Sequence, residues 1–512
     1  MKLKELCTAI GVECPAEANE LEIPSITTYS KEVGDGGMFI AIRGLHTDGH
    51  SYIGEALERG AAVIVAASDA SVELHGKAML LRVLDPRRAT ACLYNAFYGY
   101  PAQKLRFIGV TGTNGKTSVT HLLRRILEAA LLPCGLIGTV GCESRGHHLE
   151  VARRDPLANM TTPDPEELYR MLSMMVADGV EYVVMEVTSH ALALGKLEPI
   201  SFVASVFTNL TPEHLDFHGS MEAYADAKAE LFAKSECSVI NVDSPHAARM
   251  LAMAGGDIVT CSAEGKRATY QALDAEPNAA MGVRYTLSSA NRRMKLRCPI
   301  PGRFTVMNSM QAAITAVELG IGPSIVKDAL ASVAGVKGRM ERVKLGPSAD
   351  ITVLIDYAHT PDALENLLRT ATELKEEHSR IHLVFGCGGD RDRSKRAPMG
   401  SIAARLADEV ILTSDNSRSE DPKAIVTEIL RGIPRREHCH VILDRERAIR
   451  FAVANAAEGD LILLAGKGHE AYEIGRDGRR PFCEEQIVKD AFTIRMNRKK
   501  HWNDRATEEQ KE

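Results

Sequence analysis

The segment Thr-Gly-Thr-Asn-Gly-Lys-Thr at 111–117 has the residue types and spacing of a loop that binds phosphate groups. It follows an apolar run, 105–110, and precedes a helix-like stretch, 119–129. In such loops backbone N–H groups surround phosphate oxygens, the lysine reaches the β- and γ-phosphates, and the last threonine hydroxyl binds Mg²⁺. Val110 stands where the strict Gly-x-x-x-x-Gly-Lys-Thr pattern has its first glycine. A glycine-rich turn without function is the alternative, but strand, Gly-Lys-Thr and helix in register favour nucleotide binding.

Two further side chains suit phosphate chemistry. Glu186 lies at the end of the apolar run 182–187, and His214 follows the next strand-like run, 202–207. In a parallel sheet both would lie at the same edge as the phosphate loop, where they could hold a metal on the ATP phosphates. Taken singly, each is more often structural, so the interpretation depends on the loop.

Lys228 lies on an apolar helical face, together with Met221, Tyr224, Leu231 and Phe232. The pattern alone favours a lysine whose amine reaches solvent past its apolar neighbours. A desolvated amine, in contrast, has a lowered pKa and is nucleophilic. It could then capture CO₂ as a carbamate, which replaces a cation with an anion able to hold a divalent metal.

The last third of the chain repeats apolar strands that end in polar residues. The runs 351–355, 381–385, 409–413 and 460–464 are each followed by a helix-like stretch. The polar residues at their ends are Asp356 and His359, Asp390 and Arg391, Asp415, Asn416 and Arg418, and Lys467, His469 and Glu470. Ligands of doubly wound sheets bind outside these strand ends, so a site is expected there. No Gly-x-Gly-x-x-Gly occurs, so a dinucleotide site is not indicated.

Length and composition limit the class of protein. A chain of 512 residues needs more than one core, and alternating strands and helices predict an α/β fold. We expect units at 1–102, 103–336 and 337–512, with a hinge near Lys337.

The net charge of −6 gives no basic footprint for nucleic acid. No apolar run is long enough for a signal peptide or a membrane span, and the 11 cysteines form no Cys-x-x-Cys pair, so we expect a cytoplasmic protein with free thiols.

Several long motifs in fixed order resemble the Mur ligase family. They are the loop at 111–117, Met-Glu-Val-Thr-Ser-His at 185–190, the segment 209–218, Tyr-Ala-Asp-Ala-Lys at 224–228, Asp-Tyr-Ala-His-Thr-Pro-Asp at 356–362, Gly-Cys-Gly-Gly-Asp-Arg-Asp at 386–392 and Gly-Lys-Gly-His-Glu at 466–470. The resemblance covers nearly the whole chain. It implies a three-domain ligase: a small α/β domain for the UDP substrate, a central parallel-sheet ATPase domain and a Rossmann-like domain for the amino acid.

The resemblance also implies a role in peptidoglycan synthesis, and so in cell shape and division. The motifs at 356–362, 386–392 and 466–470 are similar to those of the members that add the third residue of the stem peptide. The implied substrates are ATP, UDP-N-acetylmuramoyl-L-alanyl-D-glutamate and an amino acid, with Mg²⁺ as cofactor. The reaction would pass through an acyl phosphate intermediate. The enzyme would be a monomer. No nucleic acid or membrane partner is implied.

The resemblance to the Mur ligase family implies roles for individual residues of this sequence. For ATP they are Gly112, Thr113, Asn114, Gly115, Lys116, Thr117, Ser118, Asn308 and Arg339. For the UDP substrate they are Ser30, His46, Thr47, Asp48, Thr161, Thr162, Thr188 and Lys196, although Tyr29-Ser30-Lys31 stands where Asp-Ser-Arg is common. The implied catalytic residues are Lys116, Glu186, His214 and Lys228, and the implied metal ligands are Thr117, Glu186, His214 and Lys228 as a carbamate.

The implied amino-acid pocket departs from the family pattern at one place. Members that add meso-diaminopimelate usually carry Asp-Asn-Pro-Arg, whereas this chain has Asp415-Asn416-Ser417-Arg418. The arginine is kept, and a guanidinium suits two-point binding of a carboxylate. Arg391, Gly466 and Glu470 match the other contacts. We therefore favour meso-diaminopimelate over L-lysine; a folylpolyglutamate synthetase-like ligase and a P-loop ATPase without ligase activity are the remaining alternatives.

Overall fold

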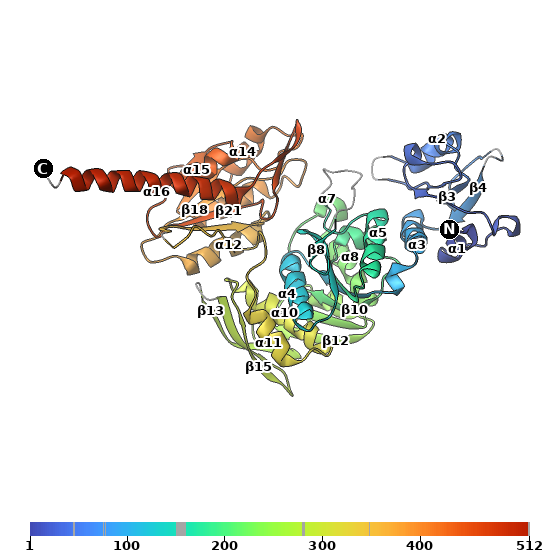
Figure 1. Ribbon diagram of the computed structural model, residues 1–512, viewed down its shortest axis with the longest axis horizontal. Coiled ribbons are helices and arrows are strands. Elements are labelled where there is room, and N and C mark those ends of the chain that lie inside the picture. Colours follow the sequence, from blue (N-terminus) through green and yellow to red (C-terminus); the bar gives the residue numbers. More distant parts are fainter. Residues whose placement is uncertain are drawn as a thin grey trace.

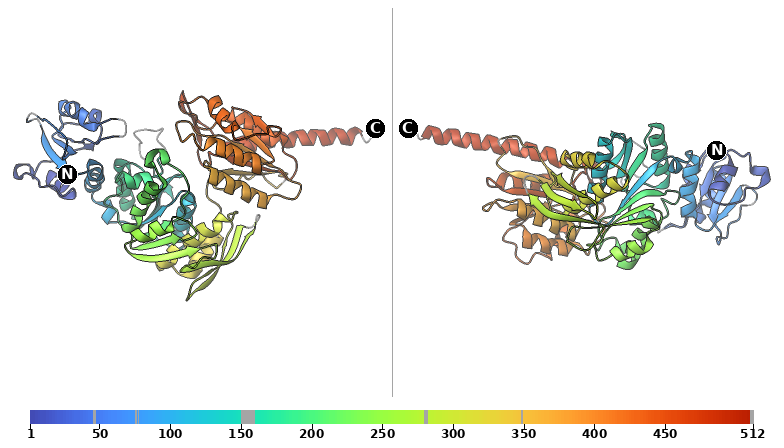
Figure 2. Two further views of the ribbon diagram at one scale, coloured as in Figure 1. Left: turned by 180° about the vertical axis from the view of Figure 1, so that it is seen from behind. Right: turned by 90° about the horizontal axis from the view of Figure 1, so that it is seen from below.

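The computed structural model describes residues 1–44, 47–74, 76, 78–149, 160–278, 282–347 and 349–509. The chain forms three α/β units, each built on its own main sheet, and the views in Figure 1 and Figure 2 place them in a row. The predicted α/β class is therefore confirmed. The boundaries at 102/103 and 336/337 stay predictions. Within the described residues, no helix has both the length and the apolar character needed to cross a bilayer.

The first unit has a four-stranded parallel sheet in the order β1-β2-β3-β4. Its strands are β1 (Ile26–Thr27), β2 (Met38–Ile40), β3 (Val63–Ala67) and β4 (Met79–Val83), and its helices are α1 (Leu3–Ala9), α2 (Ile53–Glu58) and α3 (Pro86–Phe97). Asp85 caps α3 by accepting from the backbone N–H groups of Arg87 and Arg88. Helix α3 packs against the second unit through α5 (Pro165–Ala177), and this contact joins the two cores.

The second unit has an 11-stranded sheet in the order β15-β14-β13-β12-β11-β10-β5-β9-β6-β7-β8. Its parallel part comprises β5 (Arg106–Thr111), β6 (Cys134–Gly138), β9 (Tyr182–Glu186), β10 (Phe202–Phe207), β11 (Cys237–Asn241) and β12 (Asp257–Ser262). At one end β13 (Tyr270–Asn278) pairs parallel with β12, and β14 (Gly282–Ser288) and β15 (Arg293–Cys298) follow antiparallel. At the other end β7 (Gly141–Ser144) and β8 (His147–His148) are antiparallel.

Helices cover both faces of the parallel part of this sheet. One face packs on α4 (Lys116–Ala129), α10 (Phe304–Glu318) and α11 (Pro323–Ala331), and the other on α5, α6 (Ser189–Ala193) and α8 (Met221–Ala233). Adjacent residues of β5 point to opposite faces: Phe107 enters one core and Ile108 the other. The carboxyl ends of β5, β9, β6 and β10 are thereby held at one edge, where the phosphate loop begins.

The third unit has a six-stranded sheet in the order β16-β17-β21-β18-β19-β20. Its strands are β16 (Glu341–Arg342), β17 (Thr352–Asp356), β18 (Ile381–Phe385), β19 (Glu409–Leu412), β20 (Cys439–Val441) and β21 (Leu461–Ala465). Within this six-stranded sheet, as the structure describes it, β16 alone pairs antiparallel. One face packs on α12 (Pro361–Leu374), α13 (Arg396–Leu406) and α14 (Pro422–Leu430), and the other on α15 (Arg445–Asn455) and α16 (Glu484–Glu509). Helix α16 projects from the body (Figure 1).

Candidate active site

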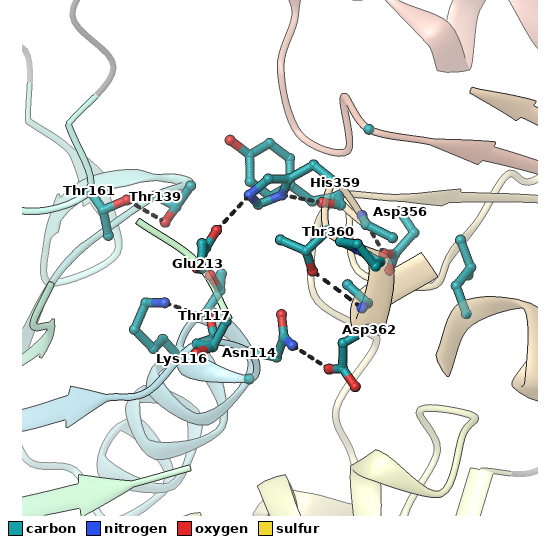
Figure 3. Close-up of a pocket in the computed structure, with 18 of the residues that line it drawn as sticks. Asn114, Lys116, Thr117, Thr139, Thr161, Glu213, Asp356, His359, Thr360 and Asp362 are labelled. Atoms are coloured by element: carbon teal, nitrogen blue, oxygen red, sulfur yellow. Dashed lines mark hydrogen bonds and ion pairs between the residues drawn. The ribbon is translucent and has the colours of Figure 1, made fainter. Parts of the chain in front are cut away.

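A cavity of about 430 Å³ lies between the second and third units. Figure 3 shows Asn114, Lys116 and Thr117 on one wall and Asp356, His359 and Asp362 on the opposite wall. The predicted site residues that line it are Thr113, Asn114, Gly115, Lys116, Thr117, Ser118, Thr161, Glu186, Thr188, His214, Asn308, Arg339, Arg391, Asp415, Asn416, Arg418, Gly466 and Glu470. The fold therefore brings together residues that were predicted for the phosphate loop, for a metal site and for an amino-acid pocket, although these roles stay predictions.

The remaining predicted residues lie beside the cavity or far from it. Thr162, Lys196, Ser417 and Lys228 are buried. Ser30, Thr47 and Asp48 belong to the first unit and do not line the cavity. Ser30 Oγ donates to the Glu55 carboxylate at 2.6 Å, a partner that the sequence pattern did not indicate. His46 lies outside the described residues.

The phosphate loop connects β5 to α4 through two glycines with positive φ. Gly112 has φ 144°, and a side chain there would collide with Thr208 Oγ1. Gly115 has φ 89°, and an added Cβ would lie 2.6 Å from Asn308 Oδ1. Only glycine suits both positions. Lys116 Nζ donates to the carbonyl oxygens of Gly112 at 3.0 Å and Thr113 at 2.9 Å, so its side chain folds back over the loop.

Arg339, from the third unit, reaches across to this loop. Its Nη2 donates to Thr117 Oγ1 at 2.8 Å, and its guanidinium lies 4.8 Å from the centre of the Tyr357 ring. A second bond between the units joins Asn114 Nδ2 to Asp362 Oδ2 at 2.7 Å. The long-range partners Tyr357 and Asp362 were not predicted as site residues, although both lie in the motif at 356–362.

Lys228 lies beneath the loop and is 2% exposed, so the interpretation that its amine reaches solvent is wrong. Its Nζ donates to Gly112 O at 2.9 Å and lies 4.7 Å from the centre of the Tyr224 ring. Burial, and then the charge of Lys116, hold the pKa of Lys228 well below its usual value. The neutral, nucleophilic form of the amine is thereby favoured.

Glu186 is held at the end of β9 by Thr139, which follows β6. The carboxylate accepts from Thr139 N at 2.9 Å and from Thr139 Oγ1 at 3.0 Å. Thr139 Oγ1 is also 3.0 Å from Thr161 Oγ1. Thr139 lines the cavity but was missed in the sequence, because a single threonine after a glycine-rich strand end carries no distinctive signal.

His214 has the left-handed backbone φ of 56° and stands beside His190, with ring centres 4.7 Å apart. Burial lowers the pKa of His214 to about 4, so its imidazole is neutral near pH 7 and a ring nitrogen can act as a ligand. Glu213, which was not predicted, lies 3.6 Å from His214 Nε2 and 3.3 Å from His359 Nε2. Burial would raise the pKa of Glu213, but its bond to His359 and the charge of His214 lower it overall.

The residue types of the predicted metal site fit Mg²⁺ in part. A threonine hydroxyl and a carboxylate are oxygen donors of the kind this ion prefers, and a carbamate on Lys228 would add another. Lys228 as it stands is a hydrogen-bond donor and cannot be a ligand. Among the described residues, no group of three or more His, Cys, Asp and Glu side chains is arranged to hold a metal. These residues would therefore suit Mg²⁺ only after Lys228 is converted to its carbamate.

The third unit contributes a polar network at the ends of β19 and β21. Lys467 is fully buried and donates to Asn416 Oδ1 at 2.9 Å and to Tyr472 O at 2.8 Å. Asn416 Nδ2 in turn donates to Glu470 Oε2 at 2.7 Å. Burial, and then the nearby Asp415 carboxylate, raise the pKa of Glu470. A cation entering beside Glu470 would stabilise its ionised form.

Arg391 and Arg418 place two guanidinium groups on the same wall. Arg418 Nη1 donates to Gly389 O at 2.8 Å and to Asn416 O at 3.3 Å, and Arg391 Nη1 donates to Asp390 O at 2.9 Å. Burial and the charge of Arg418 lower the pKa of Arg391. Within the part of the chain that the structure describes, neither arginine forms an ion pair. The two charges are suited to bind an anionic group such as a carboxylate.

Comparison with known proteins identifies the family. Residues 110–316 match the Mur ligase middle domain, residues 338–468 the Mur ligase glutamate ligase domain, and residues 22–98 the Mur ligase family catalytic domain. The chain belongs to the Mur ligase family. The expected three-domain Mur ligase architecture is therefore confirmed.

Two sequence relatives and one solved structure that are similar to this Mur ligase carry the same name. UDP-N-acetylmuramoyl-L-alanyl-D-glutamate--2,6-diaminopimelate ligase from Caldanaerobacter subterraneus is 42% identical over 492 residues, 96% of this chain and 98% of that protein. The protein of the same name from Syntrophomonas wolfei is 39% identical over 497 residues, 95% of this chain and 98% of that protein. A solved structure with this name superposes with a TM-score of 0.66 at 30% identity, covering 96% of this chain and 99% of that one.

More distant structures share the fold. Folylpolyglutamate synthase from Mycobacterium tuberculosis, solved with ADP and AMPPCP, has a TM-score of 0.60 at 18% identity and covers 74% of this chain and 92% of its own. This Mur ligase therefore shares its fold with that enzyme, but no activity follows from so low an identity.

Proposed function

We propose that this Mur ligase joins meso-diaminopimelate to UDP-N-acetylmuramoyl-L-alanyl-D-glutamate in peptidoglycan synthesis, with ATP converted to ADP and phosphate. The observation that carries the proposal is one cavity lined by both a phosphate loop and the guanidinium groups of Arg391 and Arg418, which form no ion pair with any described residue. The names of relatives that align over nearly the full chain support the same substrates.

The amino acid binds between opposite charges. Arg391 and Arg418 bind its distal carboxylate, and Glu470 binds the ammonium next to that carboxylate. L-Lysine carries the distal ammonium but no distal carboxylate, so it would leave both guanidinium groups unpaired. Meso-diaminopimelate supplies a carboxylate that can accept hydrogen bonds from both guanidinium groups, and the site therefore favours it.

The dipeptide substrate approaches from the first unit. Its uridine nucleotide binds at Ser30, Thr47 and Asp48, with His46 in the same segment, and the muramoyl dipeptide extends along Thr161, Thr162, Thr188 and Lys196. Thr161 and Thr188 line the cavity, which supports this path. The glutamyl carboxylate then ends beside the phosphate loop.

Catalysis requires positioning and charge neutralisation more than covalent participation of the protein. An oxygen of the glutamyl γ-carboxylate attacks the γ-phosphorus of ATP, the bond to the β–γ bridging oxygen breaks, and ADP leaves. Lys116 offsets the charge on the transferred phosphoryl group. The amine of the amino acid attacks the acyl phosphate, and phosphate leaves from the tetrahedral intermediate as the amine loses a proton. Glycines and N–H groups of 112–118, with Asn308 and Arg339, hold the nucleotide.

Lys228 becomes an anion before the reaction. Its neutral Nζ attacks CO₂, forms an N–C bond and releases a proton, which leaves a carbamate. Bound Mg²⁺, held by Thr117, Glu186, His214 and the Lys228 carbamate, would supply positive charge beside the ATP phosphates. The low pKa of Lys228 and its place beneath Gly112 support this assignment.

Phosphate release from ATP tests the proposal. The enzyme is assayed with UDP-N-acetylmuramoyl-L-alanyl-D-glutamate and, in parallel, with meso-diaminopimelate, L-lysine, L-ornithine or no amine. Release that requires the nucleotide substrate and is fastest with meso-diaminopimelate is expected. A maximum with L-lysine would leave the ligase and contradict the pocket assignment, and hydrolysis independent of both substrates would indicate an ATPase.

A further inference from the structure

The outer face of the β14–β15 hairpin carries a cluster of cations. In β15 the residues alternate strictly: Arg293, Lys295 and Arg297 are exposed, whereas Met294, Leu296 and Cys298 are buried. The buried set packs in the core with α10 and α11. In β14, Arg284 is exposed on the same face as the β15 cations. We call Arg284, Arg293, Lys295 and Arg297 the hairpin cations.

The register places like charges side by side. Arg284 lies directly opposite Arg297, Thr286 opposite Lys295, and Ser288 opposite Arg293. Like charges directly opposite each other on neighbouring strands are destabilising. In the residues that the structure describes, none of the hairpin cations forms an ion pair. One carboxylate, Glu276 of β13, lies opposite Arg284, so the face keeps an excess of positive charge.

The shape and composition of this face select the kind of anion. All the large apolar side chains of β14 and β15 point inward, so these two strands offer no aromatic or aliphatic anchor on the outer face. Protein interfaces depend on such anchors, and single-stranded nucleic acids stack on aromatic rings. A lipid surface needs neither, because its headgroups move laterally to meet a flat set of cations.

We propose that the hairpin cations dock the enzyme, weakly and reversibly, on a bilayer that contains anionic lipids. Clusters of about 4–8 lysines and arginines are the charge density that such surfaces attract. The net charge of −6 opposes approach from a distance. At physiological ionic strength, however, screening over about 8 Å leaves only charges close to the membrane to act.

The position of the hairpin is compatible with catalysis on the membrane. Strand β15 is the terminal strand of the 11-stranded sheet, and the hairpin forms the lower margin of the molecule in Figure 1. No residue of β14 or β15 lines the cavity between the second and third units. Docking by this face therefore leaves the reaction site open to its substrates.

Vesicle co-sedimentation tests the proposal with the full-length protein. Vesicles of phosphatidylcholine with phosphatidylglycerol are compared with vesicles of phosphatidylcholine alone, at low ionic strength and in about 0.5 M KCl, where charges are screened within a few ångströms. Binding is expected only with phosphatidylglycerol and only at low salt. Each neutralised cation should lower the partition coefficient about fivefold. The combined variant Arg284→Gln, Arg293→Gln, Lys295→Gln and Arg297→Gln should therefore lose binding.

A matched variant controls for total charge. Lys423→Gln, Arg431→Gln, Arg435→Gln and Arg436→Gln remove the same charge from exposed positions of the third unit and should retain binding. The hairpin variant should keep its ligase turnover with dissolved substrates and unfold at a temperature no lower than wild type, because it loses an unfavourable Arg–Arg pair. Absence of wild-type binding at low salt, equal binding by the hairpin variant, or tighter binding to duplex DNA than to vesicles would overturn the proposal.

Discussion

Lys116 and Lys228 donate hydrogen bonds to the same carbonyl oxygen, that of Gly112, at 3.0 and 2.9 Å. Burial lowers the pKa of both lysines, and the charge of Lys116 further lowers that of Lys228. Two ammonium groups in this arrangement repel each other with little water to screen them. Carbamylation of Lys228 would turn this repulsion into attraction, since an anion would then stand beside Lys116.

Substitution of Lys228 should therefore abolish turnover and not merely weaken binding. For Lys228→Ala we expect a loss of about three orders of magnitude in phosphate release at saturating ATP, because a charged group beside the reacting phosphate is removed. Added acetate or propionate should restore measurable turnover by replacing the lost carboxylate. Lys234→Ala is the matched control, since Lys234 follows the same helix and pairs with Glu198. Near-wild-type turnover of Lys228→Ala would contradict the carbamate role.

The guanidinium of Arg418 should determine which amino acid is used. Arg418→Ala should lower kcat/KM for meso-diaminopimelate by about 100-fold or more, because the distal carboxylate of the bound substrate loses a hydrogen-bonded cationic partner. The effect on L-lysine should be much smaller, because that substrate has no distal carboxylate. Arg431→Ala, which removes an exposed arginine of the same unit, should change neither value. Equal losses for the two amino acids would mean that Arg418 supports the loop and does not read the carboxylate.

The local sequence was sufficient to predict the parallel strands and the phosphate loop. Apolar runs of strand length, each followed by a helical pattern, fix the direction of the chain, and parallel strands bring their carboxyl ends to one edge. Run 381–385 became β18 without change, whereas α4 begins at Lys116, three residues before the predicted 119. Helix starts are uncertain because glycine and threonine in the loop resemble a cap.

The other features of the fold and of the candidate site depended on contacts between residues that are distant in the sequence. The burial of Lys228 is decided by packing beneath Gly112, which no helical pattern around Lys228 encodes. The Asn114–Asp362 bond likewise joins positions 248 residues apart. The β14–β15 hairpin was not predicted either, although the alternation of Arg293 to Cys298 is a strand signal that could have revealed it.

Acid should destabilise the third unit through Glu420. Its carboxylate accepts two bonds from the buried Arg396, at 2.8 and 2.9 Å, and this pairing lowers the pKa of Glu420 from 4.5 to about 2. The unfolded chain therefore binds a proton at a higher pH than the folded chain. The stabilisation that the Glu420 carboxylate gives to the folded state is fully present above about pH 4.5 and is lost as the pH falls towards 2.

Urea unfolding at about pH 6 and about pH 3 measures this effect. Glu420→Gln should be less stable than wild type at the higher pH and should lose less stability on acidification. Glu437→Gln, a surface change in the same unit, should follow the wild-type pH dependence. An unchanged acid-induced loss in Glu420→Gln would show that other carboxylates dominate the acid response.

The bond between Asn114 and Asp362 should hold the second and third units together. It joins the phosphate loop to the first turn of α12 at 2.7 Å. Hydrogen bonds to a charged group contribute about 1.5–3 kcal/mol, so Asp362→Ala should lower the ratio of closed to open molecules about tenfold or more. The amine bound by the third unit must meet the acyl phosphate in the second, so kcat should fall as the closed form becomes rarer.

Small-angle scattering should show a larger radius of gyration for Asp362→Ala, whereas Asp362→Asn, which can still accept from Asn114, should remain compact and active. Wild-type turnover and compactness in Asp362→Ala would mean that the cavity walls stay together without this bond, and that the Arg339–Thr117 and Glu213–His359 contacts are sufficient.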